Sequence, residues 1–139
     1  MKTVVLIASI FLMSQLKAQD SWVVFLNKQQ LLSTSTESAE KNVFSVKEED
    51  LKENHPFTLT YFDLNKEKDW TRFLMIFTTK DEEIKRQEGR KMRLTNSRLL
   101  ELLKKHKELH FYTYSLPNDP DLRARIRVRR IHLCTLVLD

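Results

Sequence analysis

The chain has 139 residues, 31% of them charged, and a formal net charge of +5. Its one cysteine cannot form an internal disulfide, so packing must stabilise the fold. With one glycine, the chain lacks the Gly-x-Ser-x-Gly turn that presents a nucleophilic serine in many hydrolases.

The first 18 residues have the pattern of a secretory signal peptide. Lys2 precedes an apolar run over residues 4–13, and the small residue Ala18 ends the segment. The run of about ten residues is much shorter than the roughly 20 that a membrane-spanning helix needs. We therefore expect residues 1–18 to be a signal peptide, no transmembrane segment, and a single β-rich domain over residues 19–139 that is periplasmic or secreted.

Most of the remaining chain has the residue pattern of short strands. Residues 57–63 alternate most regularly, with Phe57, Leu59 and Tyr61 on one face, which is typical of a strand with one wet face. Residues 70–79 are apolar on both faces, which indicates a strand covered on both sides. In chain order, the strands that we expect are 21–27, 30–33, 42–47, 57–63, 70–79, 91–95, 109–116 and 123–138.

The connections between these strands are mostly polar. Asn27 and Lys28 are expected to turn the first strand into the second, and residues 34–41 to form a loop. The highly charged residues 81–90 are expected to form an exposed hairpin or loop, in which Gly89 supplies the positive φ of a tight turn.

One helix is predicted over residues 97–106, because leucines at positions i, i+3 and i+4 share one helical face. Asn96 or Ser97 is expected to cap its start. The fold class that fits best is mainly β, an antiparallel β-sandwich of about seven or eight strands with one helix in a late connection. An α+β fold with a single antiparallel sheet stays open, because a chain with one glycine is poor in tight hairpin turns.

The most informative stretch is the last one, residues 123–138, which reads RARIRVRRIHLCTLVL. We expect one strand with a solvated basic half and a buried apolar half. In that strand Arg125, Arg127 and Arg129 form a ladder on one face, spaced by about 7 Å. A bulge at Arg129 and Arg130 would restore the alternation of faces that fails there.

This basic run is the candidate binding surface. Loss of Lys2 and Lys17 with the signal peptide lowers the 24 basic residues to 22 against 19 acidic ones, so only clustering of the charge is informative. Guanidinium groups suit bidentate binding of carboxylate, phosphate or sulfate. The residues that we select are Arg125, Arg127, Arg129, Arg130 and His132, together with Tyr112 and Tyr114, which share a strand face with His110.

The partner predicted for this surface is an anionic glycan, a lipid headgroup or an acidic protein surface. Nucleic acid is not expected, because the chain carries an export signal. The structural alternative is a solvated strand face whose arginines pair with acidic side chains of neighbouring strands.

Two other pairs have the composition of chemical sites. His132 and Cys134 face the same side of a regular strand and could act as base and nucleophile, but no oxyanion site or orienting carboxylate accompanies them. We expect Cys134 to be a core residue. His106 and His110 have the spacing of metal ligands on a helix, but the predicted helix ends between them, so no metal or other cofactor is expected.

These observations favour a small exported, non-catalytic binding module that contacts an anionic ligand or partner through a basic C-terminal strand. The alternative is a structural or accessory subunit of an envelope complex that docks by strand-edge pairing. A hydrolase that uses the cysteine and histidine pair is a distant third.

Overall fold

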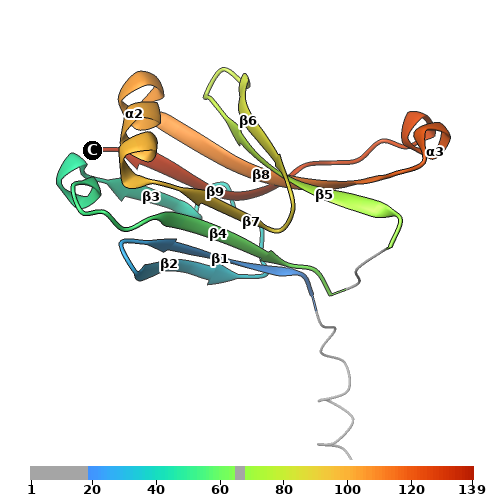
Figure 1. Cartoon of the computed structure of the whole chain (residues 1–139), viewed down its shortest axis with the longest axis horizontal. Coiled ribbons are helices and arrows are strands. Elements are labelled where there is room, and N and C mark those ends of the chain that lie inside the picture. The colour runs from blue at the N-terminus through green and yellow to red at the C-terminus, as the bar shows by residue number, and fades with distance from the viewer. Residues whose placement is uncertain (1–18, 65–67) are drawn as a thin grey trace, which may run out of the picture.

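The computed structural model describes residues 19–64 and 68–139, and in these residues nine strands form two sheets that face each other (Figure 1). The mainly β class is confirmed, and the two sheets rule out the single-sheet alternative. The predicted signal peptide, residues 1–18, lies outside the described residues.

The first sheet is antiparallel and has the strand order β2-β1-β4-β7. A turn through Asn27 and Lys28 joins its first two strands, as predicted, and both residues have the positive φ of a tight hairpin turn, 51° and 63°. The strands of this sheet are β1 (Ser21–Leu26), β2 (Gln29–Thr34), β4 (Phe57–Phe62) and β7 (Lys91–Leu94).

The second sheet has the order β3-β9-β8-β5-β6 and is not wholly antiparallel, because the short edge strand β3 runs parallel to β9. Residues 83–88, expected within an exposed hairpin or loop, pair with β5 as the other edge. The strands are β3 (Val43–Val46), β5 (Trp70–Phe77), β6 (Glu83–Glu88), β8 (Glu108–Pro117) and β9 (Ile131–Leu138).

The hydrophobic core lies between the two sheets. The predicted inner face of β4, with Phe57, Leu59 and Tyr61, is buried. Across the sandwich Phe57 meets Phe111 of β8, with ring centroids 5.0 Å apart. Cys134 is also part of this core, as predicted.

The predicted helix is α2 (Asn96–His106), which connects β7 to β8 and buries its leucine face against β8, β9 and the short 3-10 helix η1 (Glu48–Leu51). Its cap is Thr95 rather than Asn96 or Ser97, since the Thr95 hydroxyl accepts a hydrogen bond from the backbone N–H of Arg98 at 3.2 Å. The helix ends at His106, and the residue that caps it, Lys107, has a φ of 68°.

Gly89 lies where the chain passes from one sheet to the other. Its φ of 116° confirms the predicted positive φ, and its N–H donates to the carbonyl of Arg72 on β5 at 2.9 Å. The next carbonyl, that of Arg90, accepts from the N–H of Tyr61 on β4 at 2.7 Å. One glycine thus lets β6 of one sheet continue into β7 of the other.

The last strand is shorter than predicted. β9 begins at Ile131, a short helix α3 spans Pro120–Arg125, and residues 126–130 carry no regular secondary structure. Proline suits the first turn of a helix, and the carboxylate of Asp119 caps this one by accepting from the N–H of Asp121 at 3.0 Å. The predicted arginine ladder on a strand face is therefore wrong, and so is the bulge at residues 129–130.

The bulge of β9 lies at Leu133 instead. Cys134 pairs with Phe111 of β8 and His132 pairs with Tyr112, so Leu133 is the one extra residue on β9. Side chains on the two sides of a bulge change phase. As a result, His132 and Cys134 lie on opposite faces of the sheet, and the prediction that they share a face is wrong.

A hydrogen bond between the sheets holds this bulge. The indole Nε1 of Trp22, on β1, donates to the carbonyl oxygen of Leu133 at 2.9 Å, and both residues are buried. Trp22 also stacks on Tyr61 of β4, with ring centroids 6.1 Å apart and an interplanar angle of 10°. The bulge carbonyl is thus satisfied by a side chain of the opposite sheet.

Replacing Trp22 with Phe should destabilise the protein by about 1–3 kcal/mol, because the Leu133 carbonyl would be buried without its donor, in addition to the loss of ring volume. The measurement is urea unfolding followed by far-ultraviolet circular dichroism. Tyr112→Phe, which keeps an aromatic ring and removes a hydroxyl from the outer face of the second sheet, should stay within about 0.5 kcal/mol of wild type. Equal losses in the two variants would contradict the assigned role of the indole N–H.

Candidate functional site

The basic run forms an arm at one end of the molecule (Figure 1). We use "basic arm" for residues 120–130, which comprise α3 and the irregular segment that returns to β9. Every side chain from residue 120 to residue 129 is exposed, except the half-buried Ile126. The arm therefore stands out from the sandwich instead of extending its sheet.

The five arginines of the arm differ in their partners. The exposed Arg123 donates from Nε to the carbonyl oxygen of Pro117 at 3.1 Å. Arg125 and Arg127 are exposed, and neither makes an ion pair with another described residue. Arg129 Nη1 lies 2.8 Å from Glu37 Oε1, and Arg130 Nη2 lies 2.5 Å from Asp81 Oδ1. Pairing with acidic neighbours, the structural alternative, thus holds for Arg129 and Arg130 but leaves Arg125 and Arg127 free within the described part of the chain.

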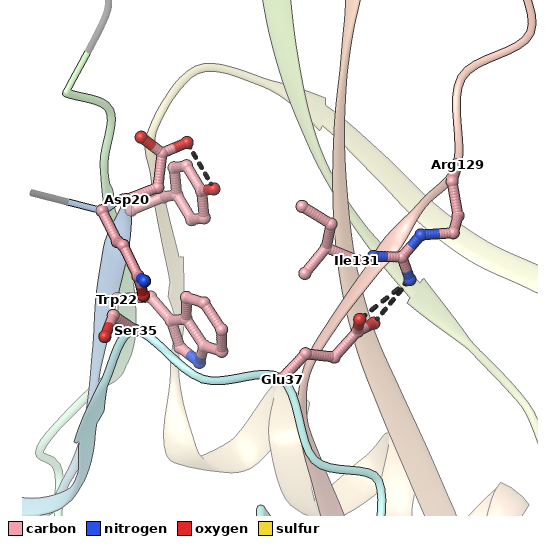
Figure 2. Close-up of a pocket in the computed structure, with 8 residues that line it drawn as sticks. Asp20, Trp22, Ser35, Glu37, Arg129 and Ile131 are labelled. Carbon is pink, nitrogen blue, oxygen red and sulfur yellow. Dashed lines mark hydrogen bonds and ion pairs between the residues drawn. The ribbon is translucent and has the colours of Figure 1, made fainter. Parts of the chain in front are cut away.

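A hollow of about 370 Å³ opens between the sheets where the arm joins β9 (Figure 2). Figure 2 shows Trp22 and Asp20 on the β1 side, Ile131 and Arg129 on the opposite side, and Glu37 reaching across from the loop after β2. Besides Arg129, the Glu37 carboxylate accepts from the backbone N–H of His132 at 2.7 Å. Glu37 thereby ties the β2–β3 loop to the start of β9.

The polar groups on the other wall of this hollow are bound to one another. The Tyr61 hydroxyl donates to Asp20 Oδ2 at 2.9 Å, and the N–H of Leu64 donates to Asp20 Oδ1 at 2.9 Å. Burial and the hydrogen bond to Asp20 raise the pKa of Tyr61, so its hydroxyl stays protonated. The carboxylates that line the hollow, those of Asp20 and Glu37, already accept hydrogen bonds from the protein. We therefore interpret these residues as contacts that hold the two sheets together rather than as a ligand site.

Next to Tyr61 lies an ion cluster that was not predicted from the sequence. The side chain of Asp63 is 6% exposed and lies 2.8 Å from Arg72 Nε and 2.5 Å from Arg90 Nε. The N–H of Arg72 Nε is not aimed at the carboxylate oxygen, so this contact is an ion pair rather than a hydrogen bond. Arg72 also lies over the ring of Tyr61, 4.2 Å from its centroid. Arg90 lies 27 positions after Asp63, and Arg72 lies on another strand, β5, so no local pattern links the two arginines to the carboxylate.

The outer face of the second sheet is aromatic and basic. Arg130 lies 4.2 Å from the ring centroid of Tyr112 and 4.6 Å from that of Phe77. Arg86, on the edge strand β6, lies 5.4 Å from the ring centroid of Tyr114. Tyr112 and Tyr114 are half-buried on one face, in agreement with the sequence analysis, and Arg130 is the only predicted site arginine that stacks on either of them in the described residues.

Beside these stacked rings is a groove of about 240 Å³ between β5, β8 and the basic arm. We use "outer groove" for it. The floor of the outer groove on β5 was not predicted as part of a site, although residues 70–79 are apolar on both faces and so supply an apolar outer surface. The residues that line the outer groove are Met75, Phe77, Arg86, Tyr114, Leu116, Val128 and Arg130.

His132 belongs to the outer face and Cys134 to the core. The His132 Nε2 atom lies 2.7 Å from the Thr135 hydroxyl, which in turn lies 3.3 Å from His110 Nδ1. Burial raises the pKa of the fully buried Cys134 thiol, which keeps it protonated and poorly nucleophilic. Because these two side chains are separated by the sheet, His132 is not placed to activate Cys134.

Two of these side chains have shifted pKa values. Burial lowers the pKa of His132 below its ordinary value of 6.5, and the nearby His110 lowers it further, against the opposite effect of Glu37. For Glu37, burial alone would raise the pKa, but the backbone N–H of His132 and the Arg129 guanidinium hold it below the ordinary 4.5. Both groups thus resist protonation in the folded state.

Neither a membrane helix nor a metal cluster is found in residues 19–64 and 68–139. No helix there is long and apolar enough to span a bilayer. The same residues contain no group of three or more histidine, cysteine, aspartate or glutamate side chains that could hold a metal ion. His106 lies at the end of α2 and His110 in β8, so the two do not share a helical face.

Folding stability should fall as the pH is lowered, in two windows. A depressed histidine pKa means that the unfolded chain binds the proton first, so stability falls once the pH drops below about 6.5. The depressed Glu37 pKa adds a second loss below about 4.5. The measurement is the urea midpoint between pH 7.5 and pH 4.

His132→Asn should remove the first window and leave the second. The half-buried His55, which lies in the η1–β4 connection, provides the control, and His55→Asn should retain both windows. An unchanged pH profile in the His132 variant would contradict the assignment of the first window to this residue.

Comparison of the chain with models of protein families, with curated proteins and with solved structures gave no match. The function must therefore be argued from the two surfaces described above, the basic arm and the outer groove.

Proposed function

We propose that this protein is an exported, non-catalytic binding module whose basic arm contacts an acidic partner. The observation that carries the proposal is the pair of exposed guanidinium groups, those of Arg125 and Arg127, which have neither a hydrogen-bond partner nor an ion-pair partner in the described part of the chain. An arginine that already binds a carboxylate has its charge partly neutralised, so it attracts a second carboxylate less strongly. Arg125 and Arg127 bear no such penalty.

An acidic protein surface fits the arm better than a glycan or a lipid headgroup. Leu122 and Val128 are exposed among the arginines. Protein interfaces combine apolar contacts with arginine, which is enriched there relative to lysine. A purely ionic ligand would leave these two apolar side chains in water, whereas a protein partner would cover them.

The non-catalytic part of the proposal is supported by the separation of His132 and Cys134. A cysteine hydrolase needs a thiolate within hydrogen-bond reach of its base. Here the thiol is buried in the core and the imidazole faces the opposite side of the sheet. The hydrolase interpretation loses the geometry on which it depended.

The test is binding of the mature chain to immobilised polyglutamate over a range of salt concentrations. The double variant Arg125→Glu, Arg127→Glu should weaken binding by about tenfold or more and reduce its dependence on salt, because two favourable charge contacts become repulsive. Circular dichroism would show that the fold is retained.

The matched control is Lys91→Glu, Arg93→Glu, which makes the same change in net charge on two exposed residues of β7, in the other sheet. This control should bind nearly as well as wild type. If both double variants lose binding equally, net charge rather than the basic arm is responsible, and the proposal fails.

A second candidate function, docking of an accessory subunit by strand-edge pairing, is favoured by β2. This strand forms an edge of its sheet, and its sequence QQLLST contains no charged residue and no proline. Edge strands are usually protected by such residues, because their free backbone groups accept an added strand. In a chain that is 31% charged, an uncharged edge is notable.

If β2 is the docking edge, a partner should stay bound at high salt, where ionic contacts between exposed groups are screened. Gln30→Lys with Ser33→Lys should abolish the salt-resistant complex in size-exclusion chromatography of the native extracytoplasmic fraction. Lysine at Ser97 and at Glu101, exposed positions on α2, provides the comparison. A mature chain that elutes as a monomer from that fraction excludes this function.

A further inference from the structure

The outer groove has the size of a site for one side chain. Its volume of about 240 Å³ is below the roughly 300–1,000 Å³ typical of small-molecule sites. Met75, which is almost fully buried, lies on the outer side of β5, and Leu116 and Val128 add apolar surface. Val128 is part of the basic arm, so the groove and the arm form one continuous surface.

The aromatic rings around the groove are not available as a platform for sugars. Arg86 lies over Phe73 and Tyr114, and Arg130 lies over Phe77 and Tyr112. A sugar ring would have to displace these guanidinium groups before it could stack. The accessible lining therefore consists of apolar side chains such as Val128 next to two guanidinium groups, which favours an apolar group flanked by carboxylates over a hydrated polyol.

The two guanidinium groups at the groove retain free donors. Arg86 uses Nε to bind Glu83, at 2.7 Å, and Arg130 uses Nη2 to bind Asp81, at 2.5 Å. Their other nitrogens donate to no residue in the described part of the chain. Since a guanidinium has five N–H donors, each group can donate to a second carboxylate while it keeps its first partner.

We propose that the outer groove binds an apolar side chain within an acidic segment of a partner protein, with flanking carboxylates on Arg86 and Arg130. This inference rests on the proposed function and gives it a specific recognition element. The small apolar hollow selects the side chain, and the surrounding positive charge selects its acidic neighbours. Arg125 and Arg127 on the adjoining arm extend the basic surface along the same segment.

The experiment uses two short peptides with blocked ends and a fluorescent label, measured by fluorescence anisotropy against the mature chain. One peptide has phenylalanine between glutamates, and the other has serine in its place. Wild type should prefer the phenylalanine peptide by about tenfold, the effect of burying one large apolar side chain. Equal binding of the two peptides would contradict the assignment of the outer groove as a side-chain site, and would leave the proposed role of the basic arm unaffected.

Val128→Asp tests the groove directly, because it places a negative charge in the lining. The variant should lose the preference for phenylalanine. The control is Val43→Asp on β3, which has nearly the same exposure, 38% against 37% for Val128, and undergoes the same change. Loss of preference in both variants would contradict the assignment.

The arm and the groove fail in different ways. The double variant Arg125→Glu, Arg127→Glu should lower the affinity for both peptides by the same factor, so that the ratio of the two affinities is unchanged. If wild type binds neither peptide nor polyglutamate, the proposed function fails together with this inference. If it binds polygalacturonate more tightly than the phenylalanine peptide, the partner is an acidic glycan and the peptide proposal is wrong.

Discussion

The hydrogen bond from the Trp22 indole to the Leu133 carbonyl is the contact on which the arrangement of the second sheet depends. A bulge leaves one residue of a strand outside the regular ladder, and a buried carbonyl without a donor is costly. Here the donor comes from the opposite sheet. The same bond therefore holds the sheets together and fixes the phase of β9 at the point where its two faces acquire different roles.

This phase decides what the neighbouring side chains do. It places Cys134 against Phe111 in the core and His132 beside Tyr112 on the outer face. Two arginines lie just before β9. Arg129 is bound by Glu37, and Arg130 stacks on the rings of Phe77 and Tyr112. The end of the basic arm is thus fixed to the sandwich by ion pairs and ring contacts, while its outer part remains exposed.

Apart from Arg123, which donates to the Pro117 carbonyl, the basic arm consequently contains two kinds of arginine. Arg129 and Arg130 have carboxylate partners and help to hold loops against the sheet. Arg125 and Arg127 are exposed and have no ion-pair partner among the described residues, so they are free to contact another molecule. Counting the charge of the run does not distinguish the two kinds, because the distinction depends on Glu37 and Asp81, which lie far away in the sequence.

The sequence predicted those parts of the fold that depend on local patterns. Alternation in residues 57–63 identified β4 and its buried face, and leucine spacing identified α2 within one residue at its start. The positive φ of Gly89 was predicted, although not its place between the two sheets, and Cys134 was recognised as a core residue. In each of these cases the residues within one or two turns of chain determine the local conformation.

The prediction failed where a distant contact or a competing local signal decides the structure. Pro120 and the Asp119 cap start a helix at a point where the arginine alternation favoured a strand. The bulge was placed at the arginine pair, because the Trp22 donor that fixes it at Leu133 is 111 positions away in the chain. For the same reason the outer groove, which is lined by β5, β6, β8 and the basic arm, was not predicted.

The scarcity of glycine also affects the turns. Asn27, Lys28, Asp81 and Lys107 all have positive φ, a conformation that costs most non-glycine residues roughly 1–2 kcal/mol. At position 81, in the turn between β5 and β6, the side chain has a use that glycine could not supply, because its carboxylate binds Arg130. A glycine there would release that guanidinium, so the choice of aspartate at this turn determines whether Arg130 is paired or free.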